Sequence, residues 1–307
     1  MEFWFTELHT ANFTISVRVK RTLEVRRTTY QDLAVLDTVD FGRMLVLDGY
    51  IQTTEADEFI YHEMIAHVPM FSHPKPERVL VIGGGDGGVV REVLRHDGVT
   101  GVDHVEIDQA VTEAARRWFP EMSAALDDPR VSQHFTDGVE FVRRTAHDQG
   151  PVYDVILVDS TDPLGPAVGL FGPVFYRNCR KALRPGGLLT VQSESPWFTQ
   201  PAMLRSYHGI RRAFPVVRLY TAHVPTYSTF SWSFTIGTEG PDPASVEVKA
   251  PLAFPTRYYT PSLHRAAFVL PAFIERVLAA PESAELKRQL EAEISSEDGA
   301  RNGAEDA

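Results

Sequence analysis

The chain has 307 residues, of which 43% are hydrophobic and 23% charged, an ordinary composition for a globular protein with a sizeable core. The net charge of −11 argues against a general nucleic-acid binder, which needs basic patches. The single cysteine, Cys179, excludes an intrachain disulfide framework and a cysteine-rich metal site. No apolar run approaches the roughly 20 residues that span a bilayer, and the first residues lack the pattern of a secretory signal. We therefore expect a cytoplasmic protein with no membrane or nucleic-acid partner.

The first 70 residues indicate an antiparallel β-domain. Apolar and polar side chains alternate over residues 15–20, the period of two that is typical of a half-buried strand. Residues 33–39 and 44–47 are further strand candidates, separated by turns that contain glycine. Residues 55–68 carry apolar positions at spacings of three and four and predict a helix. Because a proline-containing linker follows, we place the first domain at residues 1–70.

From Arg78 onward, short buried-strand runs alternate with helical stretches, the pattern of parallel βαβ units. The strand candidates are residues 79–82, 104–107, 131–135, 155–158, 187–191 and 230–236. The helical stretches include residues 109–119 and 139–145. We therefore expect an α/β domain over residues 71–280 with a doubly wound sheet, in which ligands bind at the carboxyl ends of the strands.

Residues 281–307 differ from the rest because they carry eight Asp and Glu against three Lys and Arg. They are polar and contain glycine, so we expect an acidic tail, a frayed helix followed by disorder. This tail accounts for −5 of the total charge of −11 and leaves a mild excess of −6 elsewhere. That excess suits cationic substrates and serves solubility equally well, and the sequence leaves the role of the tail open.

A loop with five glycines in six residues follows the first strand of the second domain. Gly83, Gly85 and Gly88 satisfy the G-x-G-x-x-G pattern, which lets the backbone approach a nucleotide closely. Glu106 ends the next strand, 18 residues beyond Gly88, where a carboxylate can accept hydrogen bonds from ribose hydroxyls. These features predict a nucleoside site. Asp86 within the loop would repel a pyrophosphate and instead favours a ligand that carries a cation there.

Two more acidic segments follow later strands. Asp137, before Gly138, lies where adenosine-binding Rossmann-like folds reach the exocyclic amine of the base, although an Asp-Gly turn explains it equally well. Asp159 and Asp162 follow the fourth strand in a loop that two prolines stiffen. One aspartate could orient an amine and accept its proton, and the other could hold the far end of the amine. No histidine or cysteine cluster accompanies them, so we assign no metal site, although residue type alone leaves magnesium open.

Together these motifs resemble the spermidine synthase (polyamine aminopropyltransferase) family over most of the chain, from Trp4 to about Leu270. The loop sequence GGGDGG alone is moderately specific, whereas its combination with YHEM upstream and DSTDPLGPA downstream is highly specific. The matching segments are residues 30–31, 47–52, 54–64, 83–88, 106–108, 159–167, 192–197 and 225–227.

The resemblance implies a fold, an assembly and a reaction. It implies an N-terminal β-domain that takes part in oligomerisation and in the active site, a class I methyltransferase-type Rossmann-like catalytic domain, and a homodimer or homotetramer. It also implies transfer of the aminopropyl group of decarboxylated S-adenosylmethionine, a co-substrate, to a diamine, with release of 5′-methylthioadenosine and without a cofactor. Such an in-line displacement needs mainly the positioning of reactants and the removal of one proton.

The resemblance also assigns residues, position by position. The donor and methylthioadenosine would contact Gln31, Gly83, Gly85, Asp86, Glu106, Asp137, Gly138 and Pro166. The acceptor would contact Tyr61, His62, Asp86, Asp159, Asp162 and Tyr227, with Asp159 as the catalytic proton acceptor. Asp86 would hold the donor's ammonium and disfavour ordinary S-adenosylmethionine, which carries a carboxylate at that place. Trp4, Gln52 and Gln192 match family positions near the acceptor channel.

One segment departs from the family pattern. Residues 227–232 read YSTFSW, whereas the family usually has Tyr-Pro followed by a small residue and Gly. Loss of the proline and glycine and gain of Phe230 should alter a loop near the acceptor. We expect putrescine as the acceptor, giving spermidine, with cadaverine and agmatine as alternatives that the sequence leaves open.

Three other functions compete with this hypothesis. An S-adenosylmethionine-dependent amine N-methyltransferase shares the fold but would bring an intact carboxylate beside Asp86. A nicotinamide dehydrogenase gives no reason for the acidic loop at Asp159. A non-catalytic polyamine-binding protein would be expected to lose Asp159, which is present. Aminopropyl transfer is therefore the main hypothesis.

Overall fold

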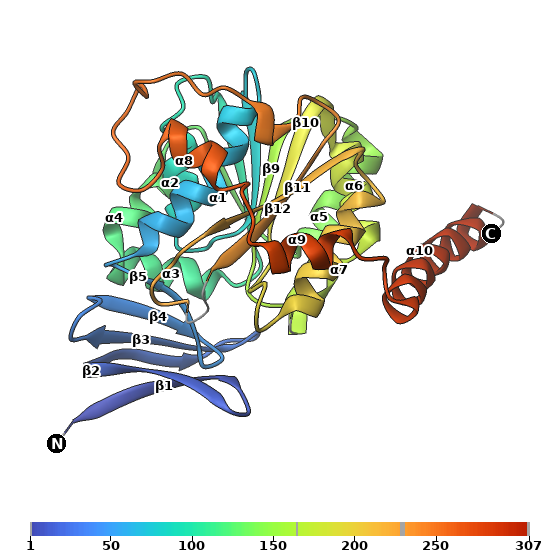
Figure 1. The fold of residues 1–307 in the computed structure, drawn as a ribbon. Coiled ribbons are helices and arrows are strands. Elements are labelled where there is room, and N and C mark those ends of the chain that lie inside the picture. The colour runs from blue at the N-terminus through green and yellow to red at the C-terminus, as the bar shows by residue number, and fades with distance from the viewer. Residues whose placement is uncertain (1, 164, 228–230, 306–307) are drawn as a thin grey trace.

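The structure is a computed structural model that describes residues 2–163, 165–227 and 231–305. It contains two sheets (Figure 1). A five-stranded antiparallel sheet at the N-terminus lies beside a seven-stranded sheet that is flanked by helices. This arrangement confirms the fold class that the sequence predicts.

The N-terminal sheet keeps its strands in chain order. They are β1 (Phe3–Thr10), β2 (Phe13–Arg27), β3 (Asp32–Thr38), β4 (Arg43–Leu47) and β5 (Tyr50–Thr54). β4 and β5 are joined by Asp48 and Gly49, whose φ angles of 47° and 85° are both positive, as the tightest hairpin turns require. Leu33 and Val35 on β3 pack with Val111 on helix α3, so one face of this sheet rests on the second domain.

The seven-stranded sheet has the strand order β11-β12-β10-β9-β6-β7-β8. Its strands are β6 (Arg78–Gly83), β7 (Gly101–Glu106), β8 (Val131–Phe135), β9 (Tyr153–Asp159), β10 (Leu183–Gln192), β11 (Val216–Ala222) and β12 (Trp232–Thr238). β6 to β10 run parallel, and β12 lies antiparallel between β10 and β11. From β6 the chain proceeds to β7 and β8, then returns to the other side of β6 at β9. Doubly wound folds bind their ligands at such a reversal of strand order.

Helices cover both faces of this sheet. Val79 and Val81 on β6 belong to a core with α1 and α2, whereas Leu80 and Ile82 belong to a core with α5 and α6, because successive strand residues face opposite sides. The helices are α1 (Glu58–Ser72), α2 (Gly88–Leu94), α3 (Gln109–Trp118), α4 (Pro120–Ser123), α5 (Gly138–Arg144), α6 (Pro173–Ala182), α7 (Gln200–Arg211), α8 (Pro261–Ala266), α9 (Ala272–Ala279) and α10 (Ala284–Glu305). Short irregular helices are η1 (Ala124–Asp127), η2 (Thr145–Gln149), η3 (Gly165–Phe171) and η4 (Pro243–Ser245).

The boundary between the domains differs from the sequence expectation. Helix α1 falls in the expected first domain, residues 1–70, yet its Met64 and Ile65 are fully buried in the core that β6 and β9 share. A parallel sheet needs cover on both faces, and α1 supplies part of that cover. The N-terminal sheet therefore ends at Thr54. The sequence reasoning also missed three strands, β1, β5 and β11, and the helices α4 and α6 to α9.

The C-terminal segment is helical. The frayed helix expected at the start of residues 281–307 is helix α10, which continues to Glu305, extends from the body of the molecule (Figure 1) and contacts α6 and α7. Leu290 is fully buried, and Leu286 and Ile294, four residues to either side, are half-buried. The mean composition of a polar tail does not reveal apolar residues that recur every four positions. Such a stripe is enough to dock a helix.

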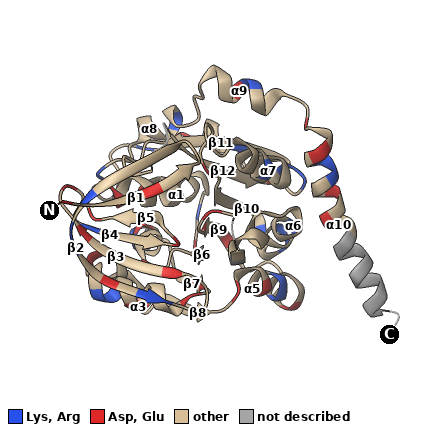
Figure 2. Cartoon of the chain, turned by 90° about the horizontal axis from the view of Figure 1, so that it is seen from below, with Lys and Arg blue, Asp and Glu red and all other residues tan. Residues whose placement is uncertain are grey.

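Charge is not concentrated along any one element in Figure 2, where Lys and Arg are scattered among Asp and Glu on the described chain. None of the helices in the described ranges has the length and apolar character that crossing a membrane demands. The charges that a ligand contacts therefore depend on the particular residues that line a pocket.

Candidate active site

A pocket lies at the carboxyl ends of β6, β7 and β9, where β5 of the N-terminal sheet and α1 form its other walls. Nearly all residues that the sequence assigned to the donor and the acceptor line it, which brings together positions from Gln31 to Tyr227. The predicted placement is thus consistent with one site, and the role of each residue stays a prediction. The exception is Pro166, which lies in η3 with its side chain outside the described part of the structure.

The loop over residues 83–88 requires glycine because neighbouring groups leave no room for a side chain. A Cβ on Gly83, whose φ is 79°, would come within 2.1 Å of the backbone oxygen of Asp159. A Cβ on Gly88 would lie 2.2 Å from the imidazole ring of His62. These contacts hold the loop against β9 and α1, so the loop presents its backbone to the pocket at a fixed place.

Glu106 ends β7 and is only 7% exposed. One of its carboxylate oxygens accepts a hydrogen bond from the backbone N–H of Asp108 at 2.9 Å. Burial raises the pKa of Glu106 to about 7, and the nearby charges of Asp108 and Asp159 add to this. Gln31, from the N-terminal domain, donates to Asp108 at 3.0 Å, so both domains contribute to this side of the pocket.

Asp137 serves as a helix cap and also lines the pocket. Its Oδ1 accepts hydrogen bonds from the backbone N–H groups of Val139 at 2.7 Å and Glu140 at 3.2 Å, at the start of α5. The turn interpretation of Asp137-Gly138 is therefore correct for one oxygen. It does not compete with a ligand contact, because both residues face the pocket.

Asp159 lies at the end of β9 beside Tyr61. The hydroxyl of Tyr61 donates to Asp159 Oδ1 at 2.7 Å. Burial and the charge of Asp86 raise the pKa of Asp159 to about 6, although His62 and Tyr61 act in the opposite direction. A carboxyl group with a pKa near 6 can gain or lose a proton close to neutral pH, as a general base must.

Asp86 faces the same space but has the opposite electrostatic surroundings. Its Oδ1 accepts from the backbone N–H of Gly88 at 2.7 Å, and its Oδ2 lies 3.5 Å from Nε2 of His62. The other ring nitrogen of His62 is 2.6 Å from Glu58. Burial would raise the pKa of Asp86, but the charge and the hydrogen bond of His62, together with the hydrogen bond from Gly88 and the charge of Arg91, outweigh it and the net shift is downward.

A second group of acids lies at the far end of the pocket. Asp162 is hydrogen-bonded to Glu194, a residue that the sequence reasoning did not single out. Burial, followed by the charge of Asp162, raises the pKa of Glu194 to about 9, and burial also raises the pKa of Asp162. Two buried carboxyls in contact hold a proton between them at neutral pH. Glu7, also unassigned, lines the pocket and accepts from the backbone of Ile51 at 2.7 Å.

These two acids had a detectable signal. Glu194 lies in the QSESPW segment and follows Gln192, whose side-chain amide donates to the backbone oxygen of Ser160 at 3.2 Å. Gln192 therefore supports the acidic loop after β9 and marks its neighbour as close to that loop. Glu7 follows the exposed Trp4 on β1, a strand that the sequence reasoning missed. Trp4 itself is not among the residues that line the pocket.

Aromatic rings form the wall between the two groups of acids. Tyr227 donates its hydroxyl hydrogen to the backbone oxygen of Gln52 at 2.5 Å. Its ring meets those of Tyr61 and Trp232 edge to face, at 5.6 Å and 4.9 Å between centroids. The expected effect of the altered loop rests on residues 228–230, including Phe230, which lie outside the described residues.

The arrangement can bind an elongated, positively charged ligand beside a nucleoside. Glu106, the glycine loop, Asp86, Asp159 and Asp162 line the pocket, and Glu194, which is not among the lining residues, lies against Asp162. The cations of such a ligand would replace the protons that the buried acids hold. Within the described ranges, no group of three or more His, Cys, Asp or Glu could hold a metal ion.

Two family models match this chain, and together they cover most of it. The spermine/spermidine synthase domain matches residues 58–249, and the spermidine synthase tetramerisation domain matches residues 3–55. The division between them, at residues 55–58, coincides with the end of β5 and the start of α1.

Curated relatives and solved structures agree with these matches. Proteins called polyamine aminopropyltransferase from Moorella thermoacetica and Caldicellulosiruptor bescii are 50% and 48% identical, over 92% and 91% of this chain and 98% and 99% of theirs. A spermidine synthase solved with the transition-state analogue AdoDATO superposes with a TM-score of 0.86 at 37% identity, over 89% of this chain and 94% of that one. The spermidine synthase of Thermotoga maritima gives 0.84 at 37% identity, over 89% and 93%.

Proposed function

Because the chain belongs to the spermidine synthase family of aminopropyltransferases, we propose that it moves the aminopropyl group of decarboxylated S-adenosylmethionine to a diamine. The observation that carries this proposal is the position of Asp159, which lines the pocket against Gly83 and Gly84 of the glycine loop and is hydrogen-bonded to Tyr61. A proton acceptor is needed at that point, where donor and acceptor would meet. Putrescine is the default acceptor, with spermidine and 5′-methylthioadenosine as products.

The donor occupies the half of the pocket formed by the glycine loop and the ends of β7 and β8. Glu106 accepts hydrogen bonds from the ribose hydroxyls, and Asp137 accepts one from the adenine amine. The donor's ammonium lies at Asp86. The remaining donor contacts are Gln31, Gly83, Gly85, Gly138 and Pro166. Ordinary S-adenosylmethionine binds poorly because its carboxylate would meet Asp86 in a partly dry site.

The diamine occupies the other half. Its attacking nitrogen lies between Tyr61 and Tyr227, next to Asp159. Its second ammonium lies at Asp162 and Glu194, where it replaces the proton that these two acids hold. Putrescine is the acceptor that the resemblance implies, and cadaverine and agmatine are the alternatives to test. His62 forms part of the wall between the two halves.

The reaction is a displacement in one step after the loss of one proton. The attacking ammonium gives a proton to Asp159, which frees the nitrogen lone pair. That lone pair forms a bond to the carbon next to the sulfonium, while the carbon–sulfur bond breaks and its electron pair goes to sulfur. Methylthioadenosine leaves neutral. An ordinary ammonium has a pKa of about 10.4, so each unit by which burial raises the pKa of Asp159 removes about 1.4 kcal/mol from the proton transfer.

The N-terminal sheet supports a homo-oligomer. The matching tetramerisation domain covers residues 3–55, and several large apolar side chains of β1 and β2 are exposed in the single chain. They are Phe3, Trp4, Leu8, Phe13 and Val25. Apolar patches of this kind mark protein–protein contacts. We propose a dimer or a tetramer, which light scattering of the purified protein would distinguish.

The test of the reaction is the release of methylthioadenosine from decarboxylated S-adenosylmethionine. Putrescine, cadaverine, agmatine and spermidine are supplied separately, and ordinary S-adenosylmethionine serves as the control donor. We expect release that depends on the amine and is fastest with putrescine. Release with no amine would contradict the proposal, as would methylation of an amine from S-adenosylmethionine.

A further inference from the structure

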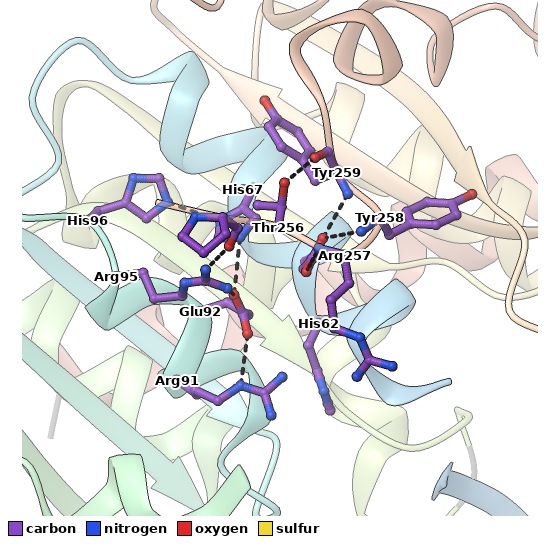
Figure 3. Close-up of polar contacts among 12 residues, drawn as sticks. His62, His67, Arg91, Glu92, Arg95, His96, Thr256, Arg257, Tyr258 and Tyr259 are labelled. Carbon is purple, nitrogen blue, oxygen red and sulfur yellow. Dashed lines mark hydrogen bonds and ion pairs between the residues drawn. The ribbon is translucent and has the colours of Figure 1, made fainter. Parts of the chain in front are cut away.

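Helices α1 and α2 share a chain of alternating charges that begins in the pocket and runs away from it. Asp86 lies 3.5 Å from His62, His62 lies 2.6 Å from Glu58, and Glu58 accepts from Arg91 at 2.8 Å and 3.1 Å. Arg91 continues to Glu92 at 2.8 Å. Figure 3 shows the outer part of this chain, in which Arg91, Glu92 and Arg95 follow one another along α2.

The position of the His62 ring is fixed from three sides. Its two nitrogens face two different carboxylates, and Gly88 lies against its ring so closely that a Cβ there would overlap it. The ring is only 2% exposed, so water cannot replace either partner. His62 therefore cannot turn toward another partner without losing a carboxylate contact.

A neutral imidazole does not fit between two carboxylates. It has one N–H and one lone pair, so one carboxylate would face a lone pair in a buried place. The imidazolium has two N–H groups and satisfies both. It has no lone pair left to accept a hydrogen bond from a protonated amine, which argues against a direct contact between His62 and the polyamine.

We propose that Glu58, held in place by Arg91, is a positioning residue that keeps His62 a cation against Asp86, and thereby keeps Asp86 an ionised carboxylate aimed at the donor's ammonium. This inference rests on the proposed function, in which Asp86 receives that ammonium. It gives His62 a role through Asp86 in place of a direct one on the acceptor.

The contrast between the two central acids supports this role. Asp86 and Asp159 are both buried in one pocket, and burial alone favours the protonated form of each. The pKa of Asp159 is raised to about 6, whereas that of Asp86 is lowered, and the charge of His62 lies directly against Asp86. One acid thus stays ionised to bind a cation while the other remains free to take up a proton, a division of roles set by surroundings.

The charged groups that face His62 either favour its protonated form or are paired with an opposite charge. Glu58 lies on its own helix, Asp86 and Asp159 on the loops after β6 and β9, and Arg91 on α2, where Glu58 neutralises it. Burial would lower the pKa of His62, but Asp86 and Glu58 outweigh it and raise the pKa to about 10. The hydroxyl of the adjacent Tyr61 is engaged by Asp159.

The first experiment compares Glu58→Gln with wild type. Dissociation constants for decarboxylated S-adenosylmethionine and for methylthioadenosine, which lacks the aminopropyl ammonium and the sulfonium charge, are measured from pH 3 to pH 8. The pH dependence of their ratio reports the ammonium contact, since the sulfonium does not titrate and a change at the ribose affects both ligands. In Glu58→Gln we expect the donor's advantage to disappear at a pH about one unit higher than in wild type, an effect of up to about tenfold below pH 5, because the pKa of Asp86 in wild type lies below its ordinary value.

Glu92→Gln is the matched control. It removes the next buried carboxylate on Arg91, with the same change of chemistry, but it has no contact with His62. We expect its ratio to follow the wild-type curve at every pH. A purely structural role of Glu58 would weaken both ligands alike at all pH values, and that outcome would overturn the proposal.

A second measurement needs no variant. Nitrogen NMR of His62 in the wild-type protein should show both ring nitrogens protonated from pH 6 to pH 9. A neutral ring at pH 7 would overturn the inference even if Glu58→Gln failed to fold. The proposed function and the proposed role of Glu58 can fail separately. Wild-type protein that binds methylthioadenosine without preferring the donor would contradict the proposed function. The protonation state of His62 would still be measurable in that protein.

Discussion

The donor half and the acceptor half of the pocket are built in different ways. Apart from Gln31, the donor residues from Gly83 to Gly138 come from one run of consecutive βαβ units, at the carboxyl ends of β6, β7 and β8. The proposed acceptor half collects Glu7, Tyr61, Asp162 and Tyr227 from the N-terminal sheet, from α1 and from loops of the second domain, with Glu194 against Asp162. The donor site is therefore a property of one supersecondary structure, whereas the acceptor site exists only when the two domains pack together.

The two halves also differ in charge. The donor half has one buried acid in contact with the expected ribose, whereas the acceptor half carries Asp162 and Glu194 in contact, with raised pKa values. A diamine brings two positive charges to acids that hold a proton. We therefore expect acceptor binding, much more than methylthioadenosine binding, to be linked to proton release.

The largest effect should come from Asp159, which lies between the halves. Asp159→Asn keeps the size of the side chain but cannot accept a proton. We expect kcat to fall about 10²- to 10⁴-fold, the range for loss of a general base. Calorimetric titration should find the affinity for methylthioadenosine unchanged. A variant that keeps its wild-type kcat would mean that solvent removes the proton.

The next effect tests the donor half alone. Glu106→Gln removes the charge that we place at the ribose, and hydrogen bonds to charged groups are worth about 1.5–3 kcal/mol. We expect methylthioadenosine and the donor to bind about 10- to 100-fold more weakly, with no change in the KM of the diamine. An equal rise in both KM values would show that the halves are not separable.

The matching change in the acceptor half is Glu194→Gln. We expect the KM of putrescine to rise about tenfold, less than the donor effect, because Asp162 remains to hold the second ammonium. The affinity for methylthioadenosine should not change. Steady-state kinetics with each substrate varied in turn would measure this. If Glu194→Gln altered only donor binding, the assignment of the two ends would be reversed.

The smallest effect concerns stability and pH. The pKa of Glu194 is raised to about 9, so its contribution to folding is fully present below its ordinary pKa and is lost as the pH rises toward 9. Wild-type protein should lose up to about 1.4 kcal/mol of unfolding free energy per pH unit from this group between pH 7 and pH 9. Urea unfolding should show a shallower loss in Glu194→Gln. Parallel curves for the two proteins would exclude a protonated Glu194.

The sequence singled out the residues of the proposed donor half because its signals are local. A strand, a glycine loop and an acid at the end of the next strand are separated by short, regular distances along the chain, as at Gly83 and Glu106. The same reasoning found Asp159 and Asp162 at the end of a later strand. It did not single out Glu194 and Glu58, although both lie in segments that match the family, residues 192–197 and 54–64, because no motif there assigns these two residues a chemical role.

The state of each acid also required the structure. Asp86 and Asp159 are the same residue type and both follow strands of one sheet, yet their pKa values move in opposite directions. The difference comes from His62, which is distant from both in sequence and lies against only one of them. The contacts of the helix expected after residue 280 have a similar origin, because Leu290 packs on a surface of α6 and α7 that composition does not describe.

The sequence by itself determined the fold class and the acidic character of the pocket, and it predicted a nucleoside site, because strand periodicity, glycine spacing and residue charge are set by neighbouring positions. Only the tertiary structure decided which acids share a proton, which one is held ionised and how the N-terminal sheet completes the acceptor half. Burial and distance between charges set these properties, and both arise from contacts between residues that are far apart along the chain.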